Sequence, residues 1–317
     1  MSDVTAPASE MPKRPSGLMR FIKAIALLRE SYIAMVGAVL VLFWILMALG
    51  ADLMPLRDPL AQSAPDLLKP AMSPAPEGGL YWLGTDDKGR DILSRLIYGS
   101  RLVLFWSILA TVVAYAVGML LGVMAGYRGG WWDEVISFIG NVFLSFPPMV
   151  LFLVILTNFG PNSPMGQYIG SLGVGSTVVS GIIIIVAITF GTAPQVARIV
   201  RGLVLDLKTR DYIAAAEVRG ETPLYIMLVE LLPNARGPLI VDACLRLGYV
   251  IIAIAVLGFL SLGLPPPYPD WGKMIAEVRG FGAMASNAMV WPALAICSLV
   301  LGLNLLADGL REISLRD

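Results

Sequence analysis

The sequence predicts an all-α, polytopic membrane protein with six transmembrane helices. Hydrophobic residues occupy 57% of its 317 positions and charged residues only 15%, whereas a soluble domain carries about 25% charged residues. Apolar runs long enough to cross a bilayer of roughly 30 Å recur along the chain. One interval, 135–197, contains no charged side chain at all. These observations indicate several membrane-spanning helices.

The lack of histidine and the zero formal net charge exclude several classes of function. Without histidine, the chain lacks the commonest metal ligand and the usual general base. A net charge of zero gives no sign of a nucleic-acid-binding surface. The two cysteines, Cys244 and Cys297, lie in apolar segments and are expected to be packing residues. We therefore expect no catalytic residue, no metal site, no cofactor and no nucleic-acid partner.

The first third of the chain is predicted to be a polar tail, one span and a long loop. Residues 1–31 are polar and basic, and 32–52 form a charge-poor stretch long enough to cross a bilayer. We expect this span to be retained, although 48–51 resembles a signal-peptide cleavage site. Residues 53–100 are too rich in proline for a packed domain and are expected to form an external loop. A helix at 91–100 is expected to lie in the membrane interface.

Residues 101–312 are predicted to hold the other five spans, and 313–317 a cytoplasmic tail. The adjacent prolines Pro147 and Pro148 fall inside the third span, where they must kink the helix and free backbone carbonyls. They are candidates for a gate as well as for a structural kink. The five spans are expected near 102–127, 135–158, 177–197, 238–262 and 280–307.

The distribution of Lys and Arg orients these spans. The segments 1–31, 128–134, 198–236 and 308–317 carry 14 of the 23 Lys and Arg residues, and the loops on the opposite side carry eight. Loops that are rich in Lys and Arg remain in the cytoplasm. We therefore expect both termini to be cytoplasmic.

The polar interval 205–233, between the fourth and fifth spans, is the predicted docking element. Three consecutive alanines (214–216) favour a short helix. Gly220 is expected to end that helix, Pro223 to begin a second one and Pro233 to close it. Because this helix–glycine–helix elbow falls on the cytoplasmic side, we interpret it as a surface for a partner. An ordinary helix end with a solvated charged face is the alternative.

The elbow resembles the "EAA" loop of ABC-importer permeases. The pattern of that family is Glu-Ala-Ala, three residues, Gly, nine residues, and Ile-x-Leu-Pro. Two positions depart from it, because Ala214 stands for the Glu and Glu230 for the Ile. Glu217, three residues after Ala214, is a candidate for the missing acid. The residues that match at the right spacing are Ala215, Ala216, Gly220, Leu232 and Pro233.

Further motifs are similar to those of the dipeptide, oligopeptide and nickel permeases. The segments 259–263, 270–274 and 304–311 match the "C" member of the permease pair of that family. A turn before the second span is similar to the external signature of the family, and it would either seat a partner or pack within the chain. The signature residues are Gly84, Thr85, Asp86, Gly89, Arg90 and Asp91. The resemblance extends from about residue 18 to the C-terminus.

The resemblance implies a type I ABC-importer permease of the bacterial inner membrane. Such a chain pairs with a homologous B-type permease, two ATP-binding subunits and an external solute-binding protein. This chain has no G-x-x-x-x-G-K-[ST] motif for phosphate binding, so ATP and Mg are expected on the partners. The residues implied in ATPase coupling are Ala215, Ala216, Glu217, Arg219, Gly220, Leu232 and Pro233.

Asp242 and Arg246 are further candidates, because they lie four residues apart on the fifth span. A charge at the centre of a membrane helix costs roughly 2.5–3.5 kcal/mol. Two interpretations stay open, an internal ion pair that seals a helix interface or groups that line the translocation path together with Pro147 and Pro148.

Peptides are the default substrate that the resemblance implies, with nickel or another small solute as the alternative. An ion-coupled secondary transporter is disfavoured, because such carriers place acids or histidines in several helices. A membrane enzyme is disfavoured too, since no nucleophile stands with a base.

Overall fold

The computed structural model describes residues 31–160, 163–171, 173, 175–264 and 268–314. The tails expected at 1–31 and 313–317 lie almost entirely outside these residues. The described helices are α2 (Tyr32–Gly50), α3 (Ile92–Arg128), α4 (Gly130–Leu144), α5 (Pro148–Phe159), α6 (Pro164–Ser171), α7 (Ser176–Leu207), α8 (Asp211–Val218), α9 (Pro223–Tyr225), α10 (Leu232–Phe259), α11 (Trp271–Val278) and α12 (Ser286–Ser314). Shorter elements are the 3₁₀ turns η1 (Ala51–Leu53), η2 (Ala64–Asp66) and η4 (Arg279–Ala285), the π-helix η3 (Ile226–Leu231), and the strands β1 (Ser73–Pro74) and β2 (Leu80–Tyr81).

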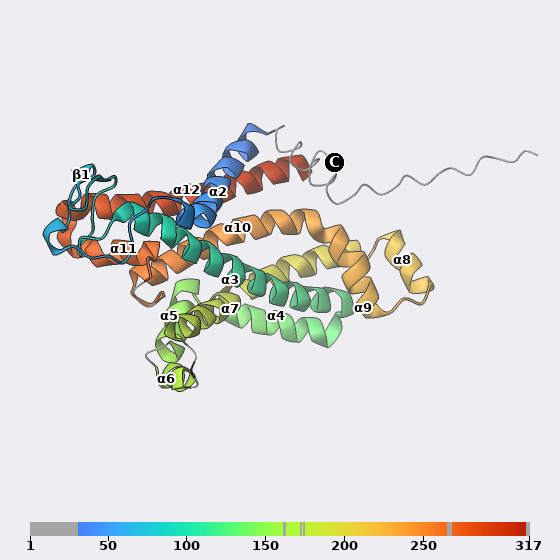
Figure 1. Ribbon diagram of the computed structural model, residues 1–317. Coiled ribbons are helices and arrows are strands. Elements are labelled where there is room, and N and C mark those ends of the chain that lie inside the picture. The colour runs from blue at the N-terminus through green and yellow to red at the C-terminus, as the bar shows by residue number, and fades with distance from the viewer. Residues whose placement is uncertain (1–30, 161–162, 172, 174, 265–267, 315–317) are drawn as a thin grey trace, which may run out of the picture.

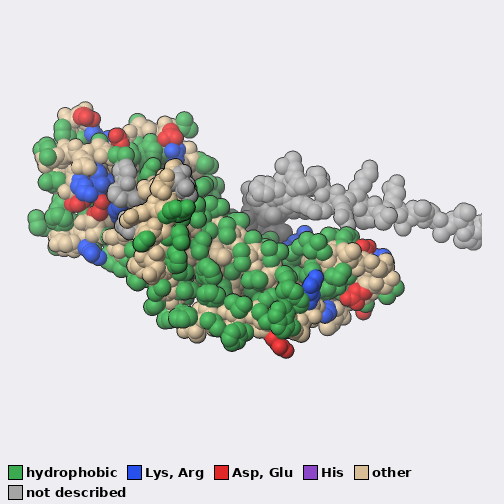
Figure 2. Space-filling model, turned by 90° about the horizontal axis from the view of Figure 1, so that it is seen from below, with side chains coloured by type: hydrophobic (Ala, Val, Ile, Leu, Met, Phe, Trp, Pro, Cys, Tyr) green, Lys and Arg blue, Asp and Glu red, His purple; other side chains and the backbone are tan. Residues whose placement is uncertain are grey.

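The long helices lie side by side in an elongated bundle (Figure 1). Helix α8 lies at one end, which we call the α8 end, and the antiparallel β1–β2 hairpin lies at the other, the hairpin end. Seen from below in Figure 2, hydrophobic side chains cover the middle of the molecule, and most charged side chains gather toward the two ends. This is the surface expected of a bundle that crosses a bilayer.

Five helices of the described residues are long and apolar enough to cross a membrane, and the bent pair α4–α5 would make a sixth span. The prediction of an all-α polytopic membrane protein is therefore confirmed. The five are Tyr32–Leu53, Ile92–Arg128, Ser176–Leu207, Arg236–Phe259 and Trp271–Glu312.

Helices α3 and α7 pack closely because a row of glycines on α3 faces a row of valines on α7. A Cβ atom built on Gly122 would lie 2.6 Å from the carbonyl oxygen of Ala197 and 2.7 Å from Cβ of Val200. Small residues four apart let membrane helices approach at backbone distance. The glycines are Gly118, Gly122 and Gly126, and the valines that they meet are Val196, Val200 and Val204.

Helix α2 is attached to α12 by the same device and by a hydrogen bond, and to α11 by an aromatic contact. A Cβ on Gly37 would lie 2.7 Å from the carbonyl oxygen of Gly302. Trp44 of α2 donates from Nε1 to Oγ of Ser298 at 2.9 Å, and its ring meets that of Trp271 edge to face at 4.8 Å. The first span therefore packs against the last one.

The structure departs from the expected helix boundaries at the start of α3. The short interfacial helix expected at 91–100 is instead the first part of α3, which runs without a break to Arg128. Asp91 caps this helix, since its Oδ2 accepts the backbone N–H of Ser94 at 2.9 Å. Gly99 lies within this helix, where Trp271 and the carbonyl of Pro269 pack directly against it and leave no room for a side chain.

The third span also differs from its expectation of one kinked helix near 135–158. Helices α4 and α5 meet at an angle of 87°. Pro147 is the N-cap of α5 and Pro148 lies in its first turn, where a missing N–H is tolerated. The two prolines therefore separate two helices and do not kink one.

The second helix of the elbow does not close at Pro233, contrary to expectation. Helix α9 leads through the π-helix η3 into α10, which begins at Leu232 and includes Pro233 in its first turn. A π-turn shifts the hydrogen-bond register by one residue, and a proline is tolerated in the first turn of the helical segment that follows it. The elbow therefore continues directly into the fifth span.

Candidate coupling and translocation sites

The elbow begins with α8, whose inner face is held by apolar packing. Ile213 is 1% exposed and Ala216 is fully buried. Both belong to one apolar cluster with Val204 of α7 and with Ile226 and Leu231 of η3. This cluster fixes α8 against the bundle, so that its opposite face is presented outward.

Gly220 ends α8 in the left-handed conformation, with φ at +78°. Its N–H donates to the carbonyl of Glu217 at 2.9 Å, and the N–H of Glu221 donates to the carbonyl of Ala216 at 3.2 Å. These bonds satisfy the last carbonyls of the helix, and glycine adopts this conformation without steric cost. No atom lies within 4 Å of a Cβ built at Gly220, so the constraint is conformational and not one of space.

The predicted coupling residues divide into an exposed group and an anchoring group. Ala216 is buried and Leu232 half-buried, so these two hold the elbow in place. Val218 is 88% exposed and Leu224 is 63% exposed, and the motif did not include either. The exposed members of the predicted set are Ala215, Glu217, Arg219, Gly220 and Pro233.

Polar bonds connect the exposed face of α8 to its neighbours. Arg219 lies 3.4 Å from Glu230 and 3.6 Å from Glu221. The hydroxyl of Tyr127, at the end of α3, donates to Glu217 at 3.5 Å. Glu230, which replaces the Ile of the family pattern, thus provides a carboxylate for the end of α8.

A polar cluster lies between α3, α7 and α10. Arg246 donates from Nε to Oδ2 of Asp242 at 2.7 Å and from Nη1 to Oε1 of Gln195 at 2.9 Å. Tyr115 donates its hydroxyl to the same carboxylate. The predicted ion pair is therefore present within the chain. Nothing in the sequence pointed to Tyr115 or Gln195, because they lie more than 50 positions from their partners and carry no charge.

Arg246 also lines a cavity of about 330 Å³ between α5, α7 and α10. Pro148 and Tyr249 line it as well, and Tyr249 is 69% exposed. Of the four predicted path residues, the structure thus brings Pro148 and Arg246 to one cavity. Pro147 and Asp242 do not line it.

The signature before α3 is a set of buried side chains that tie the hairpin end together. Asp86 accepts backbone N–H groups of Lys88 at 2.9 Å and Arg90 at 3.0 Å, and its other oxygen accepts Nε of Arg90 at 2.7 Å. Arg90 also donates to Glu277 of α11 at 2.6 Å. Thr85 receives the N–H of Lys69 at 2.8 Å. The two signature glycines, Gly84 and Gly89, have φ of +86° and +70°.

Three carboxylates of the hairpin end, Asp86, Asp87 and Glu277, lie close enough together to hold a cation. Arg90 and Arg95 lie among them, however, and form ion pairs with Asp86 and Glu277. Burial, together with the charges of Asp86 and Glu277, raises the pKa of Asp87. We interpret the group as an ion network with internal countercharges and not as a metal site.

The chain is similar to known transport proteins over most of its length. A model of the family described as "binding-protein-dependent transport system inner membrane component" matches residues 118–317. The dipeptide transport system permease protein DppC of Haemophilus influenzae is 35% identical over 88% of each chain. The DppC of Alkalihalophilus pseudofirmus is 34% identical over 92% of this chain and 88% of its own.

Two further similarities concern a different transport system and a solved structure. The glutathione transport system permease protein GsiD of Pectobacterium atrosepticum is 36% identical over 73% of this chain and 71% of its own. An inward-facing structure of the methionine ABC transporter MetNI superposes with a TM-score of 0.54 at 20% identity, covering 70% of this chain and 97% of that one. At this identity the structural match shows a shared fold.

Proposed function

Because this chain belongs to the family of binding-protein-dependent transport system inner membrane components, we propose that it forms half of the translocation pathway of an ATP-driven importer. Relatives named as dipeptide permeases, at 34–35% identity over most of both chains, support di- or oligopeptides as its substrates. The proposed partners are a homologous B-type permease, two ATP-binding subunits and an external solute-binding protein. The chain itself would contribute no ATPase site.

The observation that carries the proposal is the packing of α8, whose inner face is buried against the bundle and whose outer face is exposed. Ile213 and Ala216 anchor it, Gly220 ends it, and Val218 projects 88% exposed beside Glu217. A short helix with a fixed inner face and an exposed outer face that is partly apolar suits a cleft on another protein. Because α8 leads through η3 into α10, a movement of the docked helix would be passed to a membrane span, as in a rigid-body switch.

Lys and Arg are more frequent in the segments on the side of α8 than in the loops on the side of the hairpin. This bias supports a cytoplasmic α8 end and an external hairpin end, with both termini cytoplasmic in the inner membrane of a bacterium. In this orientation the elbow faces the compartment that supplies ATP. The signature around Asp86 and Arg90 then lies on the side of the solute-binding protein. Since these side chains are buried, we propose that they shape the surface that a partner meets and do not themselves touch it.

Arg246 is the proposed contact for substrate within the path. It lines the cavity between α5, α7 and α10, and Asp242 and Gln195 fix its guanidinium group. A guanidinium group held in this way can bind the terminal carboxylate of a peptide through charge-assisted hydrogen bonds. Tyr249 adds an exposed aromatic surface to the same cavity.

Uptake by the reconstituted complex tests the proposal. The chain is placed in proteoliposomes with its partner permease, ATPases and binding protein, and labelled dipeptide is supplied outside with ATP inside. We expect uptake that requires both ATP and the binding protein. Uptake of a nickel complex in place of peptide would support the alternative substrate. Transport by this chain alone on an ion gradient would overturn the proposal.

A further inference from the structure

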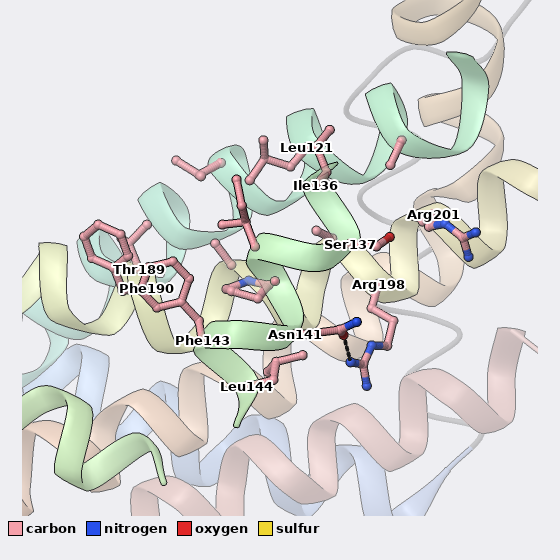
Figure 3. Close-up of a pocket in the computed structure, with 17 residues that line it drawn as sticks. Leu121, Ile136, Ser137, Asn141, Phe143, Leu144, Thr189, Phe190, Arg198 and Arg201 are labelled. Carbon is pink, nitrogen blue, oxygen red and sulfur yellow. Dashed lines mark hydrogen bonds between the residues drawn. The ribbon is translucent and has the colours of Figure 1, made fainter. Parts of the chain in front are cut away.

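Beyond the transport path, a groove of about 660 Å³ lies between α3, α4 and α7 (Figure 3). Apolar side chains, among them Leu121, Leu144 and Phe190, form most of its wall. Polar groups gather at one end, where Arg198 and Arg201 of α7 lie near Asn141 of α4. The wall of the groove is therefore apolar along most of its length and basic at one end.

The two arginines of this groove differ in their countercharges. Arg201 donates from Nε and Nη2 to the carboxylate of Asp133, the second bond measuring 2.6 Å. Arg198 donates from Nη2 to Oδ1 of Asn141 at 2.9 Å, and Asn141 is neutral. Among the described residues no carboxylate forms an ion pair with Arg198. The basic end thus carries one uncompensated positive charge on an exposed side chain.

The position of the groove indicates that its occupant comes from the membrane. Helices α3 and α7, which form two of its walls, are both candidate spans. Arg198 and Phe190 are eight residues apart on α7, which corresponds to about 12 Å along a helix. Arg198 and Arg201 lie nearer than Phe190 to the end of α7 that leads to α8, and the proposed orientation puts the inner leaflet and its headgroups at that end.

Helix α4 leaves this space open. None of its residues is fully buried, although it lies against both α3 and α7. Gly140 of α4 faces Pro194 of α7 at a distance that would leave a built Cβ 3.7 Å from the Cβ of the proline. Both residues line the groove, which lies open between these helices.

We propose that this groove binds an anionic phospholipid, with its phosphate at Arg198 and an acyl chain along the apolar wall. The single free positive charge matches the single negative charge of phosphatidylglycerol. A basic side chain near the membrane surface attracts such a lipid by an amount equivalent to about a fivefold change in binding. A bound lipid would connect α4 to α7, and α7 ends just before α8.

Lipid retention by the assembled transporter tests the site. The complex is equilibrated in vesicles of equal phosphatidylglycerol and phosphatidylcholine, extracted in mild detergent, and its bound lipids are measured by mass spectrometry. We expect phosphatidylglycerol to be enriched in the wild type and about fivefold less enriched in Arg198→Gln. The matched control is Arg210→Gln, because Arg210 is exposed, pairs with Asp206 and does not line the groove. Equal enrichment in the wild type and Arg198→Gln would overturn the proposal.

A second variant tests the apolar part without a change of charge. Gly140→Leu places a side chain in the groove, and we expect it to reduce the retention of both lipids. A photoreactive amino acid at Ile139, which lines the groove and is 49% exposed, should label lipid. Labelling of the partner permease in its place would show that a protein covers the groove, and would overturn the proposal. Both readouts are made without substrate, so their failure differs from a failure of peptide uptake.

Discussion

Arg246 is held by an acid and an amide from two helices, and this arrangement determines which variants are informative. Removing one member of a buried ion pair leaves an uncompensated charge, at a cost of about 3–5 kcal/mol. Arg246→Leu alone would therefore lower stability as well as any contact with substrate. The paired variant Asp242→Asn/Arg246→Leu removes both charges together and avoids that cost.

We expect the paired variant to assemble with its partners but to lose most peptide uptake, because the guanidinium group that faces the cavity is gone. Arg246→Lys keeps the charge but not the planar guanidinium group, and its peptide uptake should lie between that of the wild type and that of the paired variant. The measurement is ATP-dependent uptake normalised to assembled complex. Wild-type uptake in the paired variant would reduce Asp242 and Arg246 to a structural pair.

Asp270 gives the protein a pH dependence that can be measured. It is 2% exposed, and its Oδ1 accepts the N–H groups of Gly272 at 2.8 Å and Lys273 at 3.2 Å at the start of α11. Burial raises its pKa from an ordinary value of 3.8 to about 6. The folded state therefore binds this proton more tightly than the unfolded state does, and the group favours folding below pH 4 and loses that contribution as the pH rises through 6.

We expect the thermal stability of the wild type to fall relative to that of Asp270→Asn between pH 4 and pH 7, a range that covers almost the whole interval between the two pKa values of the group. The amide mimics the protonated acid and does not titrate. The rise in pKa corresponds to roughly 3 kcal/mol at most. Unfolding midpoints in detergent at the two pH values provide the measurement, and parallel midpoints for the two proteins would contradict the prediction.

At the scale of elements, the contact between α3 and α7 depends on the absence of side chains. We expect Gly122→Leu to separate the two helices, since even its Cβ would lie 2.6 Å from the carbonyl oxygen of Ala197. Overpacking of this kind typically costs 1–3 kcal/mol, and more where backbone must move. The matched control is Gly202→Leu on α7, where nothing lies within 4 Å of a built Cβ. The fraction of folded protein in detergent should drop for Gly122→Leu only.

Several element boundaries could not have been predicted from local patterns. The sequence suggested a separate helix at 91–100, but α3 runs without a break from Ile92 to Arg128. It suggested that Pro233 closes a helix, but the π-helix η3 carries the chain into α10. Pro233 is tolerated because it lies in the first turn of α10, where a missing N–H costs no hydrogen bond.

At the scale of the whole molecule, we expect a substitution of Gly220 to uncouple ATP hydrolysis from peptide uptake. Gly220→Val forces a β-branched residue into a left-handed conformation, at a cost of about 1–2 kcal/mol, and would tilt the exposed face of α8. We expect the complex to insert and hydrolyse ATP but to lose peptide uptake. Simultaneous measurement of both activities checks this, with Gly202→Val as the control. Normal uptake by Gly220→Val would contradict the assignment of the elbow.

The sequence by itself determined the class of the molecule and the place of its elbow. The length of an apolar run, the bias of Lys and Arg, and a glycine after three alanines are local properties, and they indicate spans, orientation and a helix end directly. The family resemblance, which rests on such short motifs, agrees with the matching relatives.

Only the tertiary structure decided which distant residues meet. Tyr115 and Gln195 complete the surroundings of Asp242 and Arg246, Glu277 completes those of Asp86 and Arg90, and Arg198 lines an apolar groove. None of these meetings follows from spacing along the chain. They arise because the α3–α7 packing and the 87° bend between α4 and α5 set the relative positions of helices, and those positions depend on contacts between segments far apart in the sequence.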